Sequence, residues 1–295
     1  MRLGVHLVGF ASPEGPAGIA PMLAEVGRAA DEAEVDNLSL MDHWLQVEML
    51  GGDHDPMLEG YTTLGFLAAH TRRVELKLLM TGVTYRHPGL LAKIVATLDV
   101  LSGGRAALGL GAAWYEREHR AYGVPFPPLK ERFDRLDEAV RIVRQMWSED
   151  DGPFDGAHYQ LAETICAPQP LHPVPVMVGG NGERRTLRLV AAHADACNLL
   201  LGGDAGPDLV RHKLEVLRRH CDDLGRDYDE VRRTVLWPRA FDPVRDADTF
   251  LAQMEELAAA GVEDVHVAPL GAAATDQVGF VRALGDHVVP RLRDI

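Results

Sequence analysis

The sequence has few cysteines and comparatively little positive charge. Its three cysteines, Cys166, Cys197 and Cys221, lie far apart and form no CxxC pair. This spacing argues against a disulfide framework and indicates a reducing compartment. Lysine and arginine total 30 against 44 aspartate and glutamate residues, for a net charge of -14. A nucleic-acid groove needs clustered basic residues, so we expect no nucleic-acid partner.

Long apolar runs are also missing. No stretch reaches the roughly 20 residues needed to span a bilayer. The N-terminal MRLGVHLVGF passes directly into a strand-like run, without the apolar stretch and cleavage site of a secretory signal. We therefore expect a soluble, cytoplasmic protein with no membrane partner. Its hydrophobic content of 46% over 295 residues is sufficient for a large core.

Short apolar runs alternate with amphipathic helical segments along the chain. The candidate strands are residues 3–8, 37–41, 74–80, 105–110, 174–178, 196–200, 232–238 and 262–268. Between most of them lies a segment with the apolar spacing of a helix, most clearly 131–147. Such alternation predicts parallel strands, and eight units favour a closed (β/α)8 TIM barrel over a doubly wound sheet. No linker interrupts the chain, so we predict a single α/β domain over residues 1–295.

Two segments are longer than a minimal barrel requires. Residues 42–60 follow the second predicted strand, and residues 148–173 precede the fifth. Within the latter, FDGAHYQL has the alternation and the Asp-Gly turn of a β-hairpin. Long irregular segments in compact domains are usually lids, binding loops or small hairpins. The first segment leaves the C-terminal end of a strand, the face on which barrel enzymes build their sites.

An acid, an imidazole and an indole follow one another where the second predicted strand ends. These residues are Asp42, His43 and Trp44. A capping aspartate beside an exposed histidine would account for the first two. Alternatively, His43 exchanges a proton near neutral pH, Asp42 binds a polar ring edge or orients the imidazole, and Trp44 stacks on or shields a ligand.

Small residues mark the ends of two further strands. Gly179, Gly180 and Gly182 open a turn before a helix that we expect to begin near Glu183. Backbone N–H groups at a helix start suit a phosphate, although such turns also occur without a ligand. In LGLGAAWYEREH, the small residues that include Ala112 and Ala113 permit a flat ligand, or simply tight packing.

The remaining histidines and cysteines give no metal or nucleophile motif. His6 lies in the first predicted strand and could face the barrel lumen, while His193 ends a predicted helix. Neither HxH nor HExxH occurs, so we expect no metal site. A GxSxG elbow is also missing, and the cysteines have no placed histidine partner, which favours structural roles.

Several of these segments together resemble the luciferase-like monooxygenase superfamily. MDHWLQ, residues 56–136 and VGGNGERRTLRLVAAHADACN carry the resemblance, which is strongest to the branch that uses the deazaflavin coenzyme F420. The similarity covers about residues 1–205 and resumes more weakly through the last strand and helix. It implies a TIM barrel with the cofactor ring at the C-terminal rim, covered by the two long segments.

The resemblance also assigns expected roles to residues. Asp42 and His43 would lie beside the deazaflavin ring, with His43 as proton donor or acceptor in hydride transfer. A non-proline cis peptide at Leu79–Met80 would back the ring. The other expected cofactor contacts are Thr81, Ala112, Ala113, Gly179, Gly180, Gly182 and Glu183. Trp44 and Trp114 are the expected substrate contacts, and a homodimer is the family's usual assembly.

One position departs from the family pattern. F420-dependent sugar-phosphate dehydrogenases carry a proton-donating glutamate where this sequence has Trp114. An indole cannot take that role, so sugar-phosphate dehydrogenation is not expected. Glu116 or Glu59 are the nearby carboxylates that could substitute.

The leading hypothesis is an oxidoreductase that transfers a hydride between F420 and a small organic substrate. An FMN-dependent monooxygenase acting with a flavin reductase is a close alternative, because the two ring systems have nearly the same outline. An F420 reductase is the corresponding partner for the first hypothesis. Two further hypotheses are a non-catalytic flavin- or deazaflavin-binding protein and a metal-dependent hydrolase.

Overall fold

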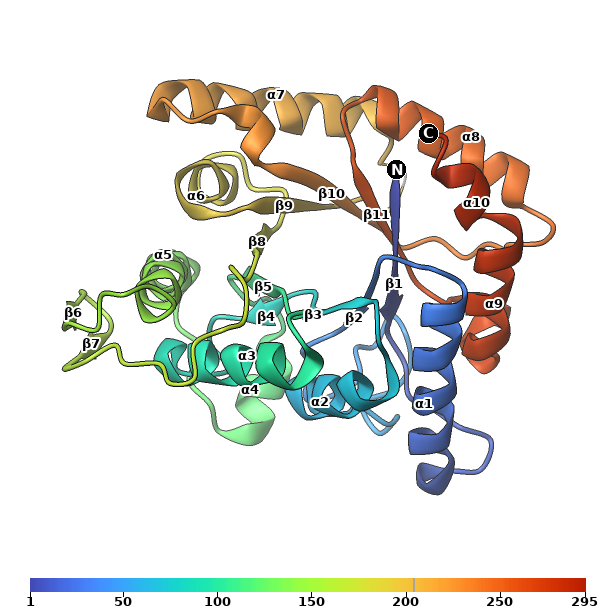
Figure 1. The fold of residues 1–295 in the computed structure, drawn as a ribbon, viewed down its shortest axis with the longest axis horizontal. Coiled ribbons are helices and arrows are strands. Elements are labelled where there is room, and N and C mark those ends of the chain that lie inside the picture. The colour runs from blue at the N-terminus through green and yellow to red at the C-terminus, as the bar shows by residue number, and fades with distance from the viewer. Residues whose placement is uncertain (204) are drawn as a thin grey trace.

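The protein is described by a computed structural model that covers residues 1–203 and 205–295 (Figure 1). Its main sheet consists of β1 (Arg2–Leu7), β2 (Asn37–Leu40), β3 (Glu75–Leu78), β4 (Thr81–Gly82), β5 (Leu108–Gly111), β8 (Val176–Gly179), β9 (Ala196–Leu200), β10 (Arg232–Trp237) and β11 (Asp264–Val267). The strand order is β3-β2-β1-β11-β10-β9-β8-β5-β4. All neighbouring strands pair in parallel, and a bridge from Leu76 to Ala106 brings the two ends of the sheet together.

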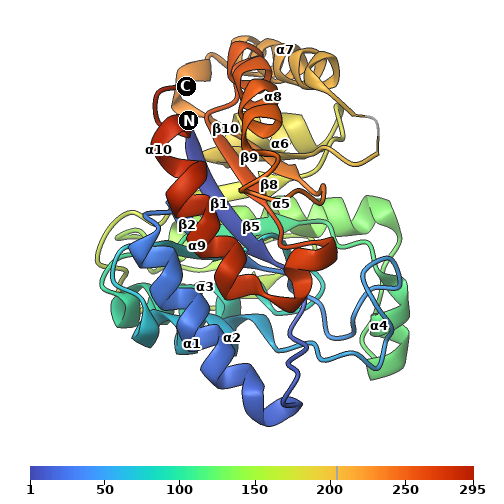
Figure 2. The same ribbon diagram turned by 90° about the vertical axis from the view of Figure 1, so that its right-hand side faces the viewer.

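The eight predicted strands are all present. The sheet has nine strands because β3 and β4 together occupy the third strand position of the barrel. The predicted TIM barrel is therefore confirmed. Helices surround the strands on the outside, as Figures 1 and 2 show. They are α1 (Pro16–Glu32), α2 (Gly60–His70), α3 (Pro88–Ser102), α4 (Glu116–Tyr122), α5 (Leu129–Met146), α6 (Thr186–His193), α7 (Pro207–Leu224), α8 (Ala247–Ala259), α9 (Gln277–His287) and α10 (Val289–Leu292). Two 3-10 turns, η1 (Tyr228–Glu230) and η2 (Gly271–Thr275), precede β10 and α9.

Helix α5 matches the predicted helix 131–147 closely. Its apolar residues at helical spacing, including Leu136, Val140 and Val143, are buried in the core between the helix and the sheet. Across residues 1–203 and 205–295, no helix has both the length and the apolar character needed to cross a membrane.

The strands place apolar residues toward the helices and polar residues toward the lumen. In β1, for example, Val5 and Leu7 belong to the apolar core, whereas His6 lies on the opposite face. His6 is buried, and its Nδ1 lies 3.0 Å from Oγ of Ser39. Burial lowers the pKa of His6 to about 3, so its imidazole is neutral at physiological pH.

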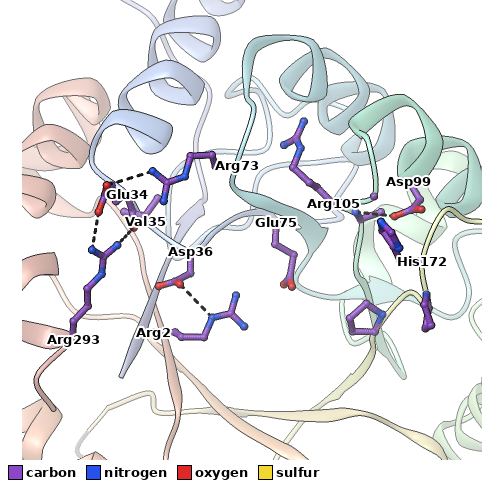
Figure 3. Close-up of a pocket in the computed structure, with 14 residues that line it drawn as sticks. Arg2, Glu34, Val35, Asp36, Arg73, Glu75, Asp99, Arg105, His172 and Arg293 are labelled. Carbon is purple, nitrogen blue, oxygen red and sulfur yellow. Dashed lines mark hydrogen bonds and ion pairs between the residues drawn. The ribbon is translucent and has the colours of Figure 1, made fainter.

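A cavity of about 400 Å³ lies at the N-terminal ends of the strands (Figure 3). Its charged side chains are largely paired with one another. Glu34 contacts Arg73 and Arg293, and Arg2 Nε lies 3.4 Å from Asp36 Oδ1. This end of a TIM barrel normally serves stability, while the opposite end carries the site.

Glu75 makes the stability of this end dependent on pH. Its carboxylate is 2.8 Å from Nζ of the fully buried Lys77. Burial alone would raise the pKa of Glu75, but Lys77 and nearby arginines outweigh it and lower the pKa to about 2. Because the folded-state pKa lies below the unfolded value, Glu75 stabilises the fold above about pH 4.5, and this stabilisation is lost as the pH falls toward 2.

We expect the urea midpoint of the protein to fall between pH 5 and about pH 3, with a shallower decrease in Glu75→Gln. The glutamine variant lacks the ionisation that couples folding to pH at this position. Equal slopes for the two proteins would show that Glu75 does not contribute.

The two long segments lie in different places. Residues 42–60 leave the C-terminal end of β2 and run beside α4, as Figure 2 shows. The predicted hairpin is confirmed as β6 (Phe154–Asp155) and β7 (Gln160–Leu161). It packs outside the barrel against α5 (Figure 1), because Glu138 accepts hydrogen bonds from the backbone N–H groups of Ala157 and Tyr159 at 2.7 and 2.9 Å. Residues 42–60 therefore begin at the rim of the barrel, whereas the hairpin lies outside it.

Candidate active site

The predicted site residues lie at the C-terminal ends of β2, β3, β5 and β8. In a barrel of parallel strands these ends share one rim. Asp42 and His43 follow β2, the pair Leu79–Met80 follows β3, Ala112 follows β5 and Gly180 follows β8. The fold thus brings together segments that are separated by as much as 138 positions in the chain (180 minus 42).

His43 is held by a carboxylate from a different part of the chain. Its Nδ1 lies 2.9 Å from Oε1 of Glu118, which belongs to the first turn of α4. The His43 side chain is 12% exposed, whereas that of Glu118 is fully buried. An imidazole fixed in this way at a strand end is suited to general acid–base chemistry.

Glu118 has three further partners besides the His43 ring. Its carboxylate accepts hydrogen bonds from the backbone N–H groups of Trp44 at 2.7 Å and Leu45 at 3.4 Å, and from the hydroxyl of Tyr85. Burial alone would raise the pKa of Glu118, but the hydrogen bonds from His43, Tyr85 and Trp44 outweigh burial and hold the pKa below its usual value. Glu118 is therefore ionised at neutral pH.

Asp42 is buried in an ion pair. Arg86 donates from its two terminal nitrogens to the two Asp42 oxygens at 2.6 and 3.0 Å, and it also contacts Glu59. Burial raises the pKa of Asp42, while the bonds from Arg86 oppose that rise. The bidentate contact favours the charged pair at neutral pH. Both Asp42 oxygens are thus engaged by protein, and Asp42 is 2% exposed.

The expected cis peptide bond occurs between Leu79 and Met80. The neighbouring glycines make room for this segment. A Cβ at Gly109 would lie 2.3 Å from the carbonyl oxygen of Leu78 and 2.7 Å from Sδ of Met80, and one at Gly179 would lie 2.7 Å from Cε of Met80. Gly109, within β5, therefore has no room for a side chain, and Gly179, at the end of β8, leaves space for the Met80 side chain.

The two predicted substrate contacts differ in their surroundings. Trp44 stacks on Tyr122 at 5.5 Å and meets the edge of Tyr85 at 4.4 Å, so it packs against α4. Trp114 is 57% exposed and lies in an edge-on arrangement 5.4 Å from the His43 ring. Of the two indoles, Trp114 therefore has the free surface beside the imidazole.

The helix after β8 begins later than the sequence predicted. The glycine-rich turn suggested a start near Glu183, but α6 begins at Thr186. Residues 183–185 form a turn instead, in which Glu183 binds Lys213 at 2.6 Å and His212 at 2.9 Å. The Glu183 carboxylate is thus tied to α7.

A cavity of about 550 Å³ adjoins Gly182. Four cationic side chains line it, namely Lys130, Arg184, Arg185 and Lys213. Lys130 and Arg185 both pair with Asp134, and Lys213 pairs with Glu183, so four cationic groups share two carboxylates. The excess of positive charge at this turn suits an anionic group.

The two residues that hold the predicted pair, Glu118 and Arg86, could not be identified from the sequence. Of the two carboxylates expected nearby, Glu116 is exposed, and Glu59 pairs with Arg86 and caps α2. A weak signal existed for Arg86, since a lone arginine shortly after a buried strand can reach a carboxylate on the neighbouring strand.

Comparisons with known proteins agree with this geometry. A family model described as luciferase-like monooxygenase matches residues 1–277. An F420-dependent glucose-6-phosphate dehydrogenase from Kineococcus radiotolerans is 34% identical over 222 residues, which cover 75% of this chain. The aligned region spans 64% of that relative, which is slightly less than two thirds of its length.

Solved structures show the same fold at lower identity. An F420-dependent secondary alcohol dehydrogenase, in complex with an F420–acetone adduct, has a TM-score of 0.82 and 17% identity, with 99% of each chain covered. A coenzyme F420-dependent tetrahydromethanopterin reductase from Methanopyrus kandleri has a TM-score of 0.79 and 16% identity, again with 99% of each chain covered. Since the family model matches nearly the whole sequence, the chain belongs to the luciferase-like monooxygenase family.

Proposed function

We propose that this protein is an F420-dependent oxidoreductase that interconverts a small, uncharged carbonyl compound and the corresponding alcohol. The observation that carries the proposal is His43, anchored by Glu118 at the rim where Leu79–Met80 and Trp114 also lie. The F420-dependent relative and the F420-dependent structural neighbours support the same cofactor.

The residues at the rim fit the chemistry of F420. The cationic side chains around Gly182 suit the phosphate-bearing tail, and the segment Leu79–Met80 suits the back of the ring. When bound, F420 supplies a carbon centre that donates or accepts a hydride. Asp42 does not need to contact the ring in this arrangement, because Arg86 engages both of its oxygens.

His43 provides the proton that accompanies hydride transfer. Reduction of a carbonyl requires a proton on the substrate oxygen, and oxidation of an alcohol releases one. An imidazole can both donate and accept a proton, and the contact with Glu118 keeps that of His43 in place. Its proposed role is therefore the acid in one direction and the base in the other.

The surroundings of His43 favour an uncharged substrate. The nearby arginines are already engaged: Arg86 by Asp42 and Glu59, and Arg117 by Glu48 and Asp53. Trp114 offers an exposed aromatic surface in the position where sugar-phosphate dehydrogenases of the family carry a glutamate. An apolar carbonyl compound thus matches the free groups better than a dianionic sugar phosphate does.

The test is an absorbance assay of F420 reduction and oxidation with matched substrates. We expect turnover with uncharged secondary alcohols and with the corresponding ketones, and none with glucose 6-phosphate. Turnover of glucose 6-phosphate at a comparable rate would contradict the proposed substrate class, and no turnover with any alcohol or ketone would contradict the proposed reaction.

We also propose that the chain forms a homodimer through α2 and α3. Helix α2 has no aspartate, glutamate, lysine or arginine, although one side of it faces away from the core. On α3, Leu90 and Leu101 are 56% and 69% exposed. The uncharged outer side of α2 and the two exposed leucines of α3 fit a second copy of the same surface, in which Lys93 of α3 would lie among apolar residues.

Leu101→Lys is expected to convert the dimer into a monomer, because it would bury two ammonium groups in the interface. Sedimentation velocity measures the change, and Leu224→Lys, at the exposed end of α7, is the matched control that leaves the dimer intact. A parent protein that is monomeric throughout the tested concentration range would contradict this assembly.

A further inference from the structure

We propose that Glu118 is a positioning residue that fixes the tautomer of His43. In neutral His43 the ring proton would reside on Nδ1, hydrogen-bonded to the Glu118 carboxylate, and Nε2 would carry a lone pair. The tautomer is a property of the protein without cofactor. Only the effect of the tautomer on turnover rests on the proposed function.

The tautomer of His43 follows from the hydrogen bonds that the Glu118 carboxylate accepts. An ionised carboxylate can only accept, so the nitrogen that faces it must donate. Oε1 of Glu118 faces Nδ1 of His43 at 2.9 Å and the Tyr85 hydroxyl, while Oε2 faces the N–H groups of Trp44 and Leu45. A proton on Nε2 alone would leave two lone pairs facing each other at Nδ1.

The position of Glu118 does not depend on His43. Glu118 lies on α4, which is held to the barrel by other contacts. His119, the next residue, places Nε2 2.7 Å from the hydroxyl of Thr84, which follows β4. The imidazole is thus oriented by a carboxylate that has its own support.

Other titratable groups near His43 do not compete with Glu118 for this role. The negative charge of Asp42 is balanced by Arg86, and His6, which lies in the lumen, is uncharged. The Tyr85 hydroxyl donates to Glu118 itself. Glu118 is therefore the anion that acts directly on the His43 ring.

The tautomer decides which nitrogen exchanges the proton with substrate. With Nδ1–H directed to Glu118, Nε2 can accept a proton from an alcohol, and the imidazolium can return it to a carbonyl oxygen. In a serine-protease triad, a wrong imidazole tautomer costs about 10⁴ in kcat, so the expected effect is large.

Glu118→Gln provides a sharp test, because it should invert the tautomer. The backbone N–H groups of Trp44 and Leu45 can only donate, so they will hold the glutamine carbonyl oxygen. The glutamine NH₂ then faces Nδ1 of His43 and donates to it. Nδ1 becomes the acceptor, and the ring proton moves to Nε2.

The experiment is long-range ¹H–¹⁵N NMR of histidine-labelled protein without cofactor, at a pH above the usual histidine titration. The His43 signals are assigned among the 13 histidines by their loss in His43→Asn. We expect an Nδ1-protonated ring in the parent and an Nε2-protonated ring in Glu118→Gln. Tyr85→Phe, which removes a donor to the same oxygen but keeps the carboxylate, should retain the parent tautomer.

In the loaded enzyme, Glu118→Gln should also lower kcat by about 10²–10⁴ with little change in F420 affinity. An Nε2-protonated ring in the parent, or the same tautomer in parent and Glu118→Gln, would overturn the proposal. Because the NMR experiment needs no cofactor, it remains decisive even if F420 does not bind.

Discussion

His43→Asn is expected to lose about 10²–10⁴ in kcat, which is the usual contribution of a positioned acid or base. Asparagine can still accept or donate a hydrogen bond near Glu118, but it cannot exchange a proton at neutral pH. F420 affinity should change only a few-fold, because the imidazole acts on the proton of the substrate. Stopped-flow measurement of F420 oxidation and an equilibrium titration together separate these two effects.

His193→Asn is the matched control for this experiment. His193 ends α6 and lies 3.6 Å from Asp137 on the outer surface, away from the rim. We expect its turnover to equal that of the parent. If His43→Asn kept a rate within tenfold of the parent with the same substrate, His43 would not be the proton-transfer group.

Arg86→Met is expected to destabilise the protein by about 3–5 kcal/mol, because it leaves the buried Asp42 carboxylate without its partner. In the parent, the side chains of Arg86 and Asp42 are 10% and 1% exposed, so water cannot replace the lost bonds. Urea unfolding followed by circular dichroism measures the change in the free energy of unfolding.

Two further variants distinguish the effect of the unpaired buried charge on stability from the effect of lost side-chain packing. Asp42→Asn combined with Arg86→Met removes both charges and should recover a large part of the stability. Arg117→Met breaks ion pairs with Glu48 and Asp53 that are about half exposed, and it should cost at most about 1 kcal/mol. Equal effects of Arg86→Met and Arg117→Met would contradict the importance of the buried pair.

The sequence predicted the barrel well because its signal is local. Each strand is a short apolar run bounded by polar residues, and α5 has a regular apolar face. The hairpin was also predictable, since its turn and alternation lie within residues 154–161. The start of α6 was missed because a glycine-rich connection does not show where the turn ends and the helix begins, and Glu183 is held by α7 instead.

The contacts that hold the candidate site could not be predicted in the same way. Glu118 and His43 are 75 positions apart, and Arg86 and Asp42 are 44 positions apart. Only the closed barrel brings them together, and no periodicity links them. The resemblance to a family predicted which residues contact the cofactor, but it did not reveal that Arg86 binds both oxygens of Asp42 or that Trp44 packs against α4.

The most direct test of the central claim is a parallel fluorescence titration of the purified protein with F420 and with FMN. We predict saturable F420 binding, with a much lower affinity for FMN. Replacing Arg184 and Lys213 together by glutamine should weaken F420 binding, since both line the cavity at Gly182. Preference for FMN would instead support a flavin-dependent monooxygenase, and failure to bind either molecule would contradict the assignment of this rim as a cofactor site.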